Sequence, residues 1–369
     1  MAAVLFVSKP IAPPWNDSGK NLVRDLARGL RRHRATLMVR GESDAQLTSA
    51  DLAPIYRAHS GGFAPGLSDQ ARVMAHLLSS RSYRLWHFFF APNPKSCLAG
   101  RIATGLRRTR SVHTLSSAPK DPRAIVPQLF ADVSVALSRH TQDRLLNAGL
   151  APERLVRIAP AIEPLHAPSA ERFLHLRDEL GLPRDAFVVV YPGDLEFGEG
   201  GSLCIEAVRA LGRSDVRLVM ACRTKTPRAV TVEHALKERV AREGLSHQVS
   251  FVGETRRIHD LLACADVVCL PSADLYAKMD YPLVLLEAMS LARTVIVAKG
   301  SAAEELCEGD AALSVEVQAD ALAAALTQLA DQPHRRAQVG LTASRAVGER
   351  YTYTAMAAAY EALYDRLLV

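Results

Sequence analysis

A single carboxylate, Glu287, stands in an otherwise apolar helical stretch. The residues on either side of it, from Leu283 to Leu291, are leucine, valine, alanine, methionine and one serine. Apolar residues at every angular position predict a helix that is buried all round. An ionised carboxyl group buried there without a partner is strongly destabilising. We therefore expect Glu287 to bind a ligand, with an internal ion pair to Arg293 as the alternative.

Three cations could form an anion site beside this helix. Arg223 and Lys225 follow the apolar stretch 217–222, and Lys278 precedes the Glu287 helix. In open parallel sheets, ligands bind beyond the carboxyl ends of the strands, where a cation after a strand would lie. Such cations hold phosphate oxygens through charge-assisted hydrogen bonds. For Arg223 and Lys225 a solvated loop is the simpler explanation.

The loop from Ser8 to Lys20 is a second candidate binding loop, because it runs from a strand to a helix. Gly19 permits close approach of a backbone, and Lys20 and the first helical amides would face a ligand. Lys9 could meet an anionic acceptor or be an ordinary surface lysine. The helix cap is expected to be Asn16, Asp17 or Ser18.

Phosphate-loop motifs of other enzyme classes do not occur in the sequence. The 8–20 loop lacks the Walker pattern. Gly198 and Gly200 have the spacing of the first two glycines of a dinucleotide-binding loop, but the position of its third glycine, 203, is leucine. A nicotinamide-dependent enzyme is therefore disfavoured.

The composition is that of an ordinary globular protein with two domains. The 369 residues are 49% hydrophobic and 23% charged, and a single core rarely extends beyond about 300 residues. No apolar run approaches the roughly 18 residues of a transmembrane helix. The expected location is the cytoplasm.

Charge is distributed unevenly along the chain. The first 164 residues hold 23 lysines and arginines against 11 aspartates and glutamates, and the remainder holds 22 against 28. Two clusters stand out: Arg28, Arg31, Arg32 and Arg34, and then Arg101, Arg107, Arg108 and Arg110. They suit a peripheral position on an anionic membrane surface or a phosphorylated acceptor, with a solvated helix face as the plainer alternative. The clusters lack interleaved aromatic residues, so nucleic acid is not an expected partner.

Short apolar segments alternate with helical periodicity, which predicts parallel sheets. The expected strands are 3–7, 35–39, 85–90, 110–115, 133–136, 187–191, 217–221, 249–252, 267–270 and 294–298. The expected helices of the first half are 21–32, 69–78 and 142–148. Prolines between 158 and 180 mark a boundary. We expect one domain over 1–164, a second over 165–350, and a C-terminal helix, 351–369, that packs back on the first.

Further motifs occur in order along the chain. They are Ser138 to Ile162, Leu180-Gly-Leu-Pro183 before Phe187 to Gly193, Phe251-Val-Gly253, Ala265-Asp266 to Pro271-Ser272, and Gly300 to Gly309. Together with the Glu287 helix they resemble the retaining glycosyltransferases of family four over nearly the whole chain. The resemblance implies an α/β protein with the GT-B fold: two tandem Rossmann-like, doubly wound domains that face each other across a cleft. The first would bind the acceptor and the second the donor nucleotide.

The resemblance also implies roles for individual residues. In the family, the glutamate that matches Glu287 binds the ribose hydroxyls of the nucleotide. Amides at the start of its helix face the diphosphate, and the turn of Pro282 and Leu283 occupies that position here. Ser272 and Gly193 fall at donor-binding positions. The acceptor side would be the loop of Lys9, Asn16, Ser18, Gly19 and Lys20.

One departure from the family pattern concerns the donor sugar. Met279 stands where the family has a sugar-contacting glutamate. Asp280 either substitutes for it as a catalytic residue or caps the Glu287 helix, which is expected to begin near Asp280 or Tyr281 with Pro282 in its first turn.

A second departure concerns the diphosphate. Asp194 and Glu199 stand where the family has two cations. Two unit charges about 4 Å apart interact by about 4 kcal/mol at an effective dielectric constant near 20. Diphosphate binding therefore requires compensation by Arg223, Lys225 or Lys278, or Mg²⁺ held by the two carboxylates. Otherwise the donor differs from that of the family.

A third departure falls at the end of strand 110–115, where the family has a histidine. The matching residue is Ser116, which is the second catalytic candidate. His113 lies three residues earlier, on the opposite face of the strand. His87, in strand 85–90, is expected to be a satisfied core histidine.

These observations predict transfer of a hexose from a nucleoside diphosphate-sugar to an unknown acceptor, lipid-linked or phosphorylated, with retention at the anomeric carbon. Such a transfer needs no protein nucleophile when the diphosphate leaving group is stabilised electrostatically. No cofactor is expected beyond the donor, with Mg²⁺ as an open alternative. Because several family positions are altered together, the rival prediction is a catalytically weakened GT-B protein that binds a nucleotide or a glycan. A phosphorylase or epimerase of the same architecture is a third.

Overall fold

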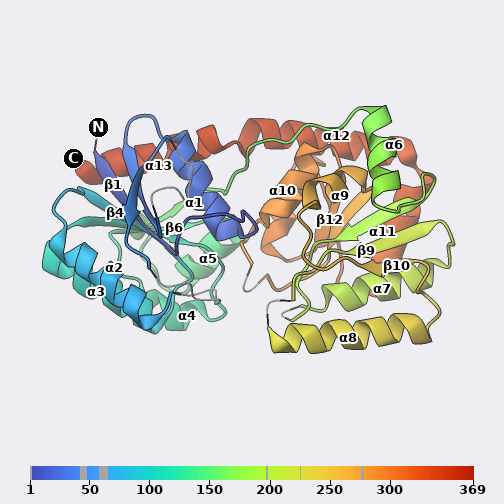
Figure 1. Cartoon of the computed structure of the whole chain (residues 1–369), viewed down its shortest axis with the longest axis horizontal. Helices are drawn as coiled ribbons and strands as arrows, with labels where there is room; N and C mark the ends of the chain where they lie inside the picture. The colour runs from blue at the N-terminus through green and yellow to red at the C-terminus, as the bar shows by residue number, and fades with distance from the viewer. Residues whose placement is uncertain (1, 42–47, 58–64, 197, 225, 276–277) are drawn as a thin grey trace. The chain divides into compact units, whose positions relative to one another are not determined.

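The structure is a computed structural model that describes residues 2–41, 48–57, 65–196, 198–224, 226–275 and 278–369. It divides into two compact units, shown in Figure 1. Unit 1 comprises Met1–Glu163, Tyr276–Tyr281 and Tyr351–Val369; unit 2 comprises Pro164–Leu275 and Pro282–Arg350. The chain therefore passes between the units four times.

Unit 1 contains a seven-stranded parallel sheet in the order β3-β2-β1-β4-β5-β6-β7. The strands are β1 (Ala3–Val7), β2 (Arg34–Val39), β3 (Asp51–Pro54), β4 (Leu85–Phe90), β5 (Arg110–Leu115), β6 (Val133–Ala136) and β7 (Leu155–Arg157). The helices are α1 (Ser18–Gly29), α2 (Leu67–Ser79), α3 (Pro94–Arg107), α4 (Pro122–Ile125), α5 (Arg139–Asn147) and α13 (Tyr353–Leu368), with 3-10 turns η1 (Val126–Gln128) and η2 (Pro152–Arg154). Helices α1 and α13 pack together over one face, and α2 and α3 lie over the other (Figure 1).

A buried polar network attaches α13 to the sheet of unit 1. Nδ1 of His87 lies 2.6 Å from the Tyr364 hydroxyl, and Nε2 lies 2.7 Å from Oγ1 of Thr114. The Tyr360 hydroxyl bonds the same threonine at 2.9 Å. His87 is thus fully hydrogen-bonded, as expected for a core histidine.

Helix α1 ends at Gly29, three residues before the predicted end, because α13 binds the amides that follow. Oε1 of Glu361 accepts hydrogen bonds from the backbone N–H groups of Arg31, at 2.7 Å, and of Arg32 and His33. The surrounding arginines are also paired: Arg28 with Glu163, Arg32 with Glu361 and Asp365, and Arg34 with Asp51. Much of the positive charge of this first arginine cluster is therefore compensated within unit 1.

Unit 2 contains a six-stranded parallel sheet in the order β10-β9-β8-β11-β12-β13. The strands are β8 (Phe187–Tyr191), β9 (Val216–Met220), β10 (Val249–Phe251), β11 (Val267–Leu270), β12 (Thr294–Ala298) and β13 (Leu313–Val315). The helices are α6 (Ala170–Glu179), α7 (Gly200–Leu211), α8 (Pro227–Arg242), α9 (Ile258–Cys264), α10 (Leu283–Ser290), α11 (Ala319–Asp331) and α12 (Pro333–Arg350), with the 3-10 helix η3 (Ala302–Cys307). Helices α7 and α11 pack together on one side of the sheet, and α9, α10 and α12 lie on the other (Figure 1). Within the described ranges of both units, no helix has the length and apolar character needed to cross a bilayer.

Candidate functional site

The sheet of unit 2 reverses its strand order between β8 and β11, which are neighbours although β9 and β10 separate them in sequence. Loops on either side of such a reversal diverge beyond the carboxyl ends of the strands and form the usual ligand site of an open α/β sheet. The described residues of unit 2 in these loops are 192–196, 198 and 199, between β8 and α7, and 271–275 and 282, between β11 and α10. Five of the predicted donor-binding residues fall there: Gly193, Asp194, Glu199, Ser272 and Pro282.

Close packing of small residues fixes the loop after β8. A Cβ on Gly193 would lie 1.8 Å from the ring of the buried Tyr191, and the Tyr191 hydroxyl donates to the backbone oxygen of Asp194 at 3.0 Å. A Cβ on Gly200 would lie 2.4 Å from Oγ of Ser272. Ser272, just past β11, therefore lies directly against the amino end of α7.

The carboxylates of this loop differ in their surroundings. Oδ1 of Asp194 accepts a hydrogen bond from the Glu196 amide at 2.8 Å, and the Glu196 carboxylate accepts one from the Thr226 hydroxyl. Glu199 occupies the N-cap position of α7, where it is exposed and makes no capping bond. Throughout the described part of the chain, no group of three or more His, Cys, Asp or Glu side chains is arranged to hold a metal ion.

Of the cations predicted after β9, Arg223 lies 3.7 Å from Glu254, measured between Nη1 and Oε1. Lys225 lies outside the described residues. Lys278 is half-buried and belongs to the 276–281 segment of unit 1.

Glu287 lies on the partly open side of α10. Val284 and Glu287, three residues apart, are half-buried, and the remaining residues of the helix are buried. The prediction of a helix buried all round is therefore wrong along this stripe, where the helix keeps an edge accessible. The Glu287 carboxylate lies 3.5 Å from Nε2 of His259, on α9, and its side chain is 16% exposed.

The alternative ion pair between Glu287 and Arg293 is not formed. The Arg293 guanidinium instead donates to the backbone oxygens of Leu291, at 3.1 Å, and of Ala265, at 3.4 Å. The sequence did not point to His259, because only the packing of α9 against α10 brings it to Glu287.

Helix α10 begins at Leu283 with Pro282 at its N-cap, so Asp280 is not the cap. Proline has no side-chain acceptor, and the helix start has no side-chain capping bond. First-turn amides left in this way are suited to an anion.

Asp280 belongs to unit 1 and is buried there. Oγ of Ser138 donates a hydrogen bond to its carboxylate at 2.7 Å and itself accepts one from the Thr141 amide, capping α5. Burial raises the pKa of Asp280, and the hydrogen bond from Ser138 acts in the opposite direction. The alternative that Asp280 caps the helix of Glu287 is therefore wrong, because Asp280 instead bonds the residue that caps α5.

The loop after β1 in unit 1 is held by its own charged residues. Asp17, rather than Asn16 or Ser18, caps α1 by accepting from the Lys20 amide at 3.1 Å, and its other oxygen pairs with Lys9. Nζ of Lys20 donates to the backbone oxygen of Ala12 at 2.9 Å. Ser18 and Gly19 form the first turn of α1, and Asn16 is exposed before it.

Past β5, Ser116 is half-buried. His113 is fully buried between Phe90 and Phe130, with Nε2 3.1 Å from the Phe90 oxygen. Burial lowers its pKa to about 4, so it is neutral at pH 7.

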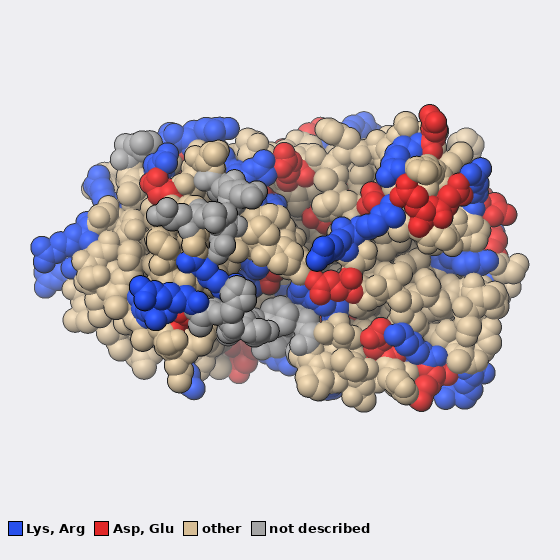
Figure 2. Space-filling model, viewed as in Figure 1, with Lys and Arg blue, Asp and Glu red and all other residues tan. Residues whose placement is uncertain are grey.

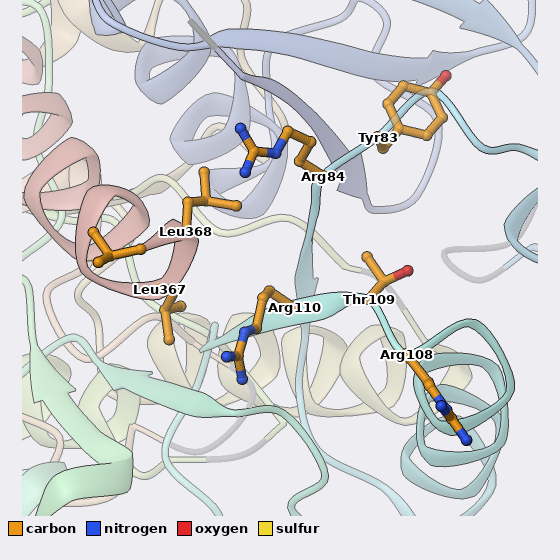
Figure 3. Close-up of a pocket in the computed structure, with 8 residues that line it drawn as sticks. Tyr83, Arg84, Arg108, Thr109, Arg110, Leu367 and Leu368 are labelled. Atoms are coloured by element: carbon orange, nitrogen blue, oxygen red, sulfur yellow. The ribbon is translucent and has the colours of Figure 1, made fainter.

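A hollow of about 340 Å³ lies elsewhere in unit 1, at the amino ends of β4 and β5 (Figure 3). It is lined by Tyr83, Arg84, Arg108, Thr109, Arg110, Leu367, Leu368 and Val369. Figure 3 shows the side chains of Arg84 and Arg110 extending toward the end of α13, while Arg108 points away from them. The hollow lies at the amino ends of the strands, whereas the loop after β1 lies at their carboxyl ends.

Comparison with known proteins finds a family similarity in the second half of the chain. Residues 186–332, from the start of β8 to the end of α11, match the family described as glycosyl transferases group 1. Gly193, Ser272, Pro282 and Glu287 all lie within this matched segment.

Curated relatives match a larger part of the chain. It is 27% identical to a D-inositol 3-phosphate glycosyltransferase of Corynebacterium glutamicum over 66% of its own length, and 26% identical to the protein of that name from Corynebacterium efficiens, also over 66%. The chain spans about three fifths of the length of these relatives, 60% and 59%.

Solved structures match the whole chain. Anabaena HepE in complex with UDP-glucose is 19% identical, with a TM-score of 0.80 over 100% of both chains. The sucrose-phosphate synthase of Thermosynechococcus elongatus is 18% identical, with a TM-score of 0.78 over 100% of this chain and 99% of its own. The predicted fold class, two Rossmann-like parallel sheets of the GT-B type, is thereby confirmed.

Proposed function

We propose that the protein is a retaining hexosyltransferase of family four that takes its sugar from UDP-sugar and transfers it to a phosphorylated acceptor. The observation that carries the proposal is Glu287, a carboxylate on the open side of α10. It lies within the segment that matches the group 1 family, in a helix whose start has no side-chain cap. HepE, which shares the fold, was solved with UDP-glucose, and the curated relatives are named for D-inositol 3-phosphate.

In the proposed reaction, Glu287 accepts hydrogen bonds from the ribose hydroxyls. The amides at Leu283 and the hydroxyl of Ser272 donate to the diphosphate, where negative charge develops as the sugar–oxygen bond breaks. The acceptor hydroxyl attacks from the face that the diphosphate leaves, so the anomeric configuration is retained and no protein nucleophile is needed.

The carboxylates of the 192–199 loop are compatible with this proposal because one of them is already satisfied. The Asp194 carboxylate accepts a hydrogen bond from the Glu196 amide, and this bond stabilises its negative charge within the loop. Glu199 is exposed and screened by water. Arg223, after β9 of the same unit, supplies compensating charge in the proposed complex.

The rival proposal is a nucleotide- or glycan-binding module without transfer. It is favoured by the burial of Asp280 against Ser138, because a carboxylate committed to that bond does not replace the missing sugar contact at Met279.

Two measurements separate the proposals. Thermal unfolding is followed with UDP, GDP, ADP and their glucose conjugates, for the wild type and for Glu287→Ala. UDP release is then measured from UDP-glucose with inositol phosphate as the acceptor, and the configuration of the product is read by NMR. Stabilisation by UDP together with a retained product supports the transferase, and stabilisation without transfer to any phosphorylated acceptor supports the binding module. No stabilisation by any nucleotide would remove both the donor site and the role of Glu287.

A further inference from the structure

Helix α3 of unit 1 presents small residues to the core and large apolar residues to solvent. Its buried residues are Cys97, Gly100 and Ala103. Leu98, Ile102 and Leu106 lie on the other side, with 57%, 49% and 69% of their surfaces exposed. Spaced by four residues, they form one continuous stripe. A helix that only covers a sheet shows the reverse arrangement, so the stripe indicates a contact surface.

This orientation of α3 is fixed by close packing. A Cβ on Gly100 would lie 2.3 to 2.7 Å from the ring of Phe130, so the helix approaches that ring as closely as a glycine allows. Turning Leu98 or Ile102 into the core would push a large side chain into the same space. The apolar stripe therefore stays on the outside while unit 1 is folded.

The sequence around the stripe is strongly basic. Residues 70–120, which include β4, α3, β5 and all of α2 after its first turn, contain nine lysines and arginines and no aspartate or glutamate, and the nearest acidic residues in sequence are Asp69 and Asp121. Lys95 and Arg101 lie three residues before and after Leu98, one helical turn away in each direction. On the face drawn in Figure 2, Lys and Arg side chains predominate over unit 1, whereas both signs are mixed over unit 2.

The basic surface continues past the end of α3. Arg108 follows the last helical turn and is exposed, and with Arg84 and Arg110 it lines the hollow of Figure 3. Together, Lys95, Arg101 and Arg108 flank an aliphatic stripe along its length.

We infer that α3 is a docking surface for an anionic lipid bilayer. Leu98, Ile102 and Leu106 enter the boundary between headgroups and acyl chains, and Lys95, Arg101 and Arg108 contact anionic headgroups. An aliphatic stripe fits this partner better than nucleic acid, for which aromatic stacking side chains would be expected.

Co-sedimentation with vesicles tests the inference. One set is pure phosphatidylcholine, and the other contains phosphatidylglycerol at about a third of the lipid. The wild type is expected to pellet with the anionic vesicles only. Leu98→Gln/Ile102→Gln/Leu106→Gln should weaken this binding by about tenfold or more, because the aliphatic insertion is lost. Lys95→Gln/Arg108→Asn should weaken it by about 30-fold, and asparagine suits the left-handed backbone at position 108, where φ is 49°.

A matched variant controls for general surface effects. Val230→Gln/Leu341→Gln changes apolar residues that are exposed by 54% and 58% in unit 2 and should pellet as the wild type does. Unchanged binding of the α3 triple variant to anionic vesicles would overturn the inference. So would a lipid-free dimer that the triple variant abolishes, because the stripe would then be covered by a second copy of the chain. Equal binding to DNA and to anionic vesicles that the triple variant does not change would also overturn the inference. The basic residues would then bind any polyanion, and the apolar stripe would have no part in binding.

Discussion

Glu287→Gln should abolish most of the nucleotide affinity while leaving the fold intact. The substitution keeps the shape of the side chain and removes its charge. The Glu287 side chain on α10 is 16% exposed. Its carboxylate oxygen Oε1 lies 3.5 Å from Nε2 of His259. That distance is longer than a well-formed hydrogen bond, so the acceptor capacity of Glu287 is largely available to a ligand.

The magnitude follows from the type of bond that is lost. A hydrogen bond to a charged group contributes about 1.5 to 3 kcal/mol, which corresponds to an increase in the Kd of UDP of about 10- to 150-fold. The free energy of unfolding should change little, because a partly exposed pair such as that of Glu287 with His259 contributes little to stability.

Isothermal titration of UDP into the two proteins measures the effect, and the chain offers a matched control. Glu238 on α8 lies 3.4 Å from His234, in a histidine–glutamate pair like that of Glu287 and His259, but it is exposed and far along its helix from the carboxyl edge of the sheet. Glu238→Gln should bind UDP as the wild type does. Equal affinities for the wild type and Glu287→Gln would refute the assignment of the ribose contact to α10.

Three further predictions concern the two units. Gly193→Ala should lower the free energy of unfolding by about 1 to 3 kcal/mol in urea denaturation, because its Cβ would enter the Tyr191 ring. Gly198→Ala, in the same loop with 3.2 Å to its nearest contact, should cost less, and equal losses would contradict the packing argument. Burial raises the pKa of Asp280 above 3.8, so the folded state retains a proton that the unfolded chain releases and stability falls as pH rises through that window. Asp280→Asn should therefore become more stable relative to the wild type as pH is raised from about 4; a pH-independent difference would exclude this titration. For His113, with its pKa lowered from 6.5 to about 4, acidification from pH 7 to 5 should cost about 2 kcal/mol of stability that His113→Phe does not lose.

Most strands were predictable because both faces of each sheet are covered. Buried strands such as β8 and β12 are continuous apolar runs, and the predicted ends agree with the structure to within one residue. The edge strands β3, β7 and β13 were missed, since they are short and only partly buried.

Helix α3 was missed for a different reason. Its core side consists of cysteine, glycine and alanine, which give almost no apolar periodicity, while its large apolar residues follow the solvent side. Sequence periodicity indicates a covered face only when the larger residues point inward.

At the candidate site, the sequence drew attention to Glu287 because a lone carboxylate in an apolar helix is conspicuous, and its role in binding stays a prediction. It could not identify His259, since that contact depends on the packing of α9 against α10. Nor could it show that Lys9 and Asp17 pair within the loop after β1, or that Asp280 bonds Ser138, which is 142 residues away in sequence.

The attachment of α13 has a consequence for how the chain is made. Unit 1 begins with β1 but is completed only by residues 351–369, whose tyrosines satisfy His87 and Thr114 and whose Glu361 binds the amides after α1. During synthesis these groups are exposed until the last helix leaves the ribosome. The first unit to be translated is thus the last to be finished, and unit 2, complete at Arg350, can fold before it.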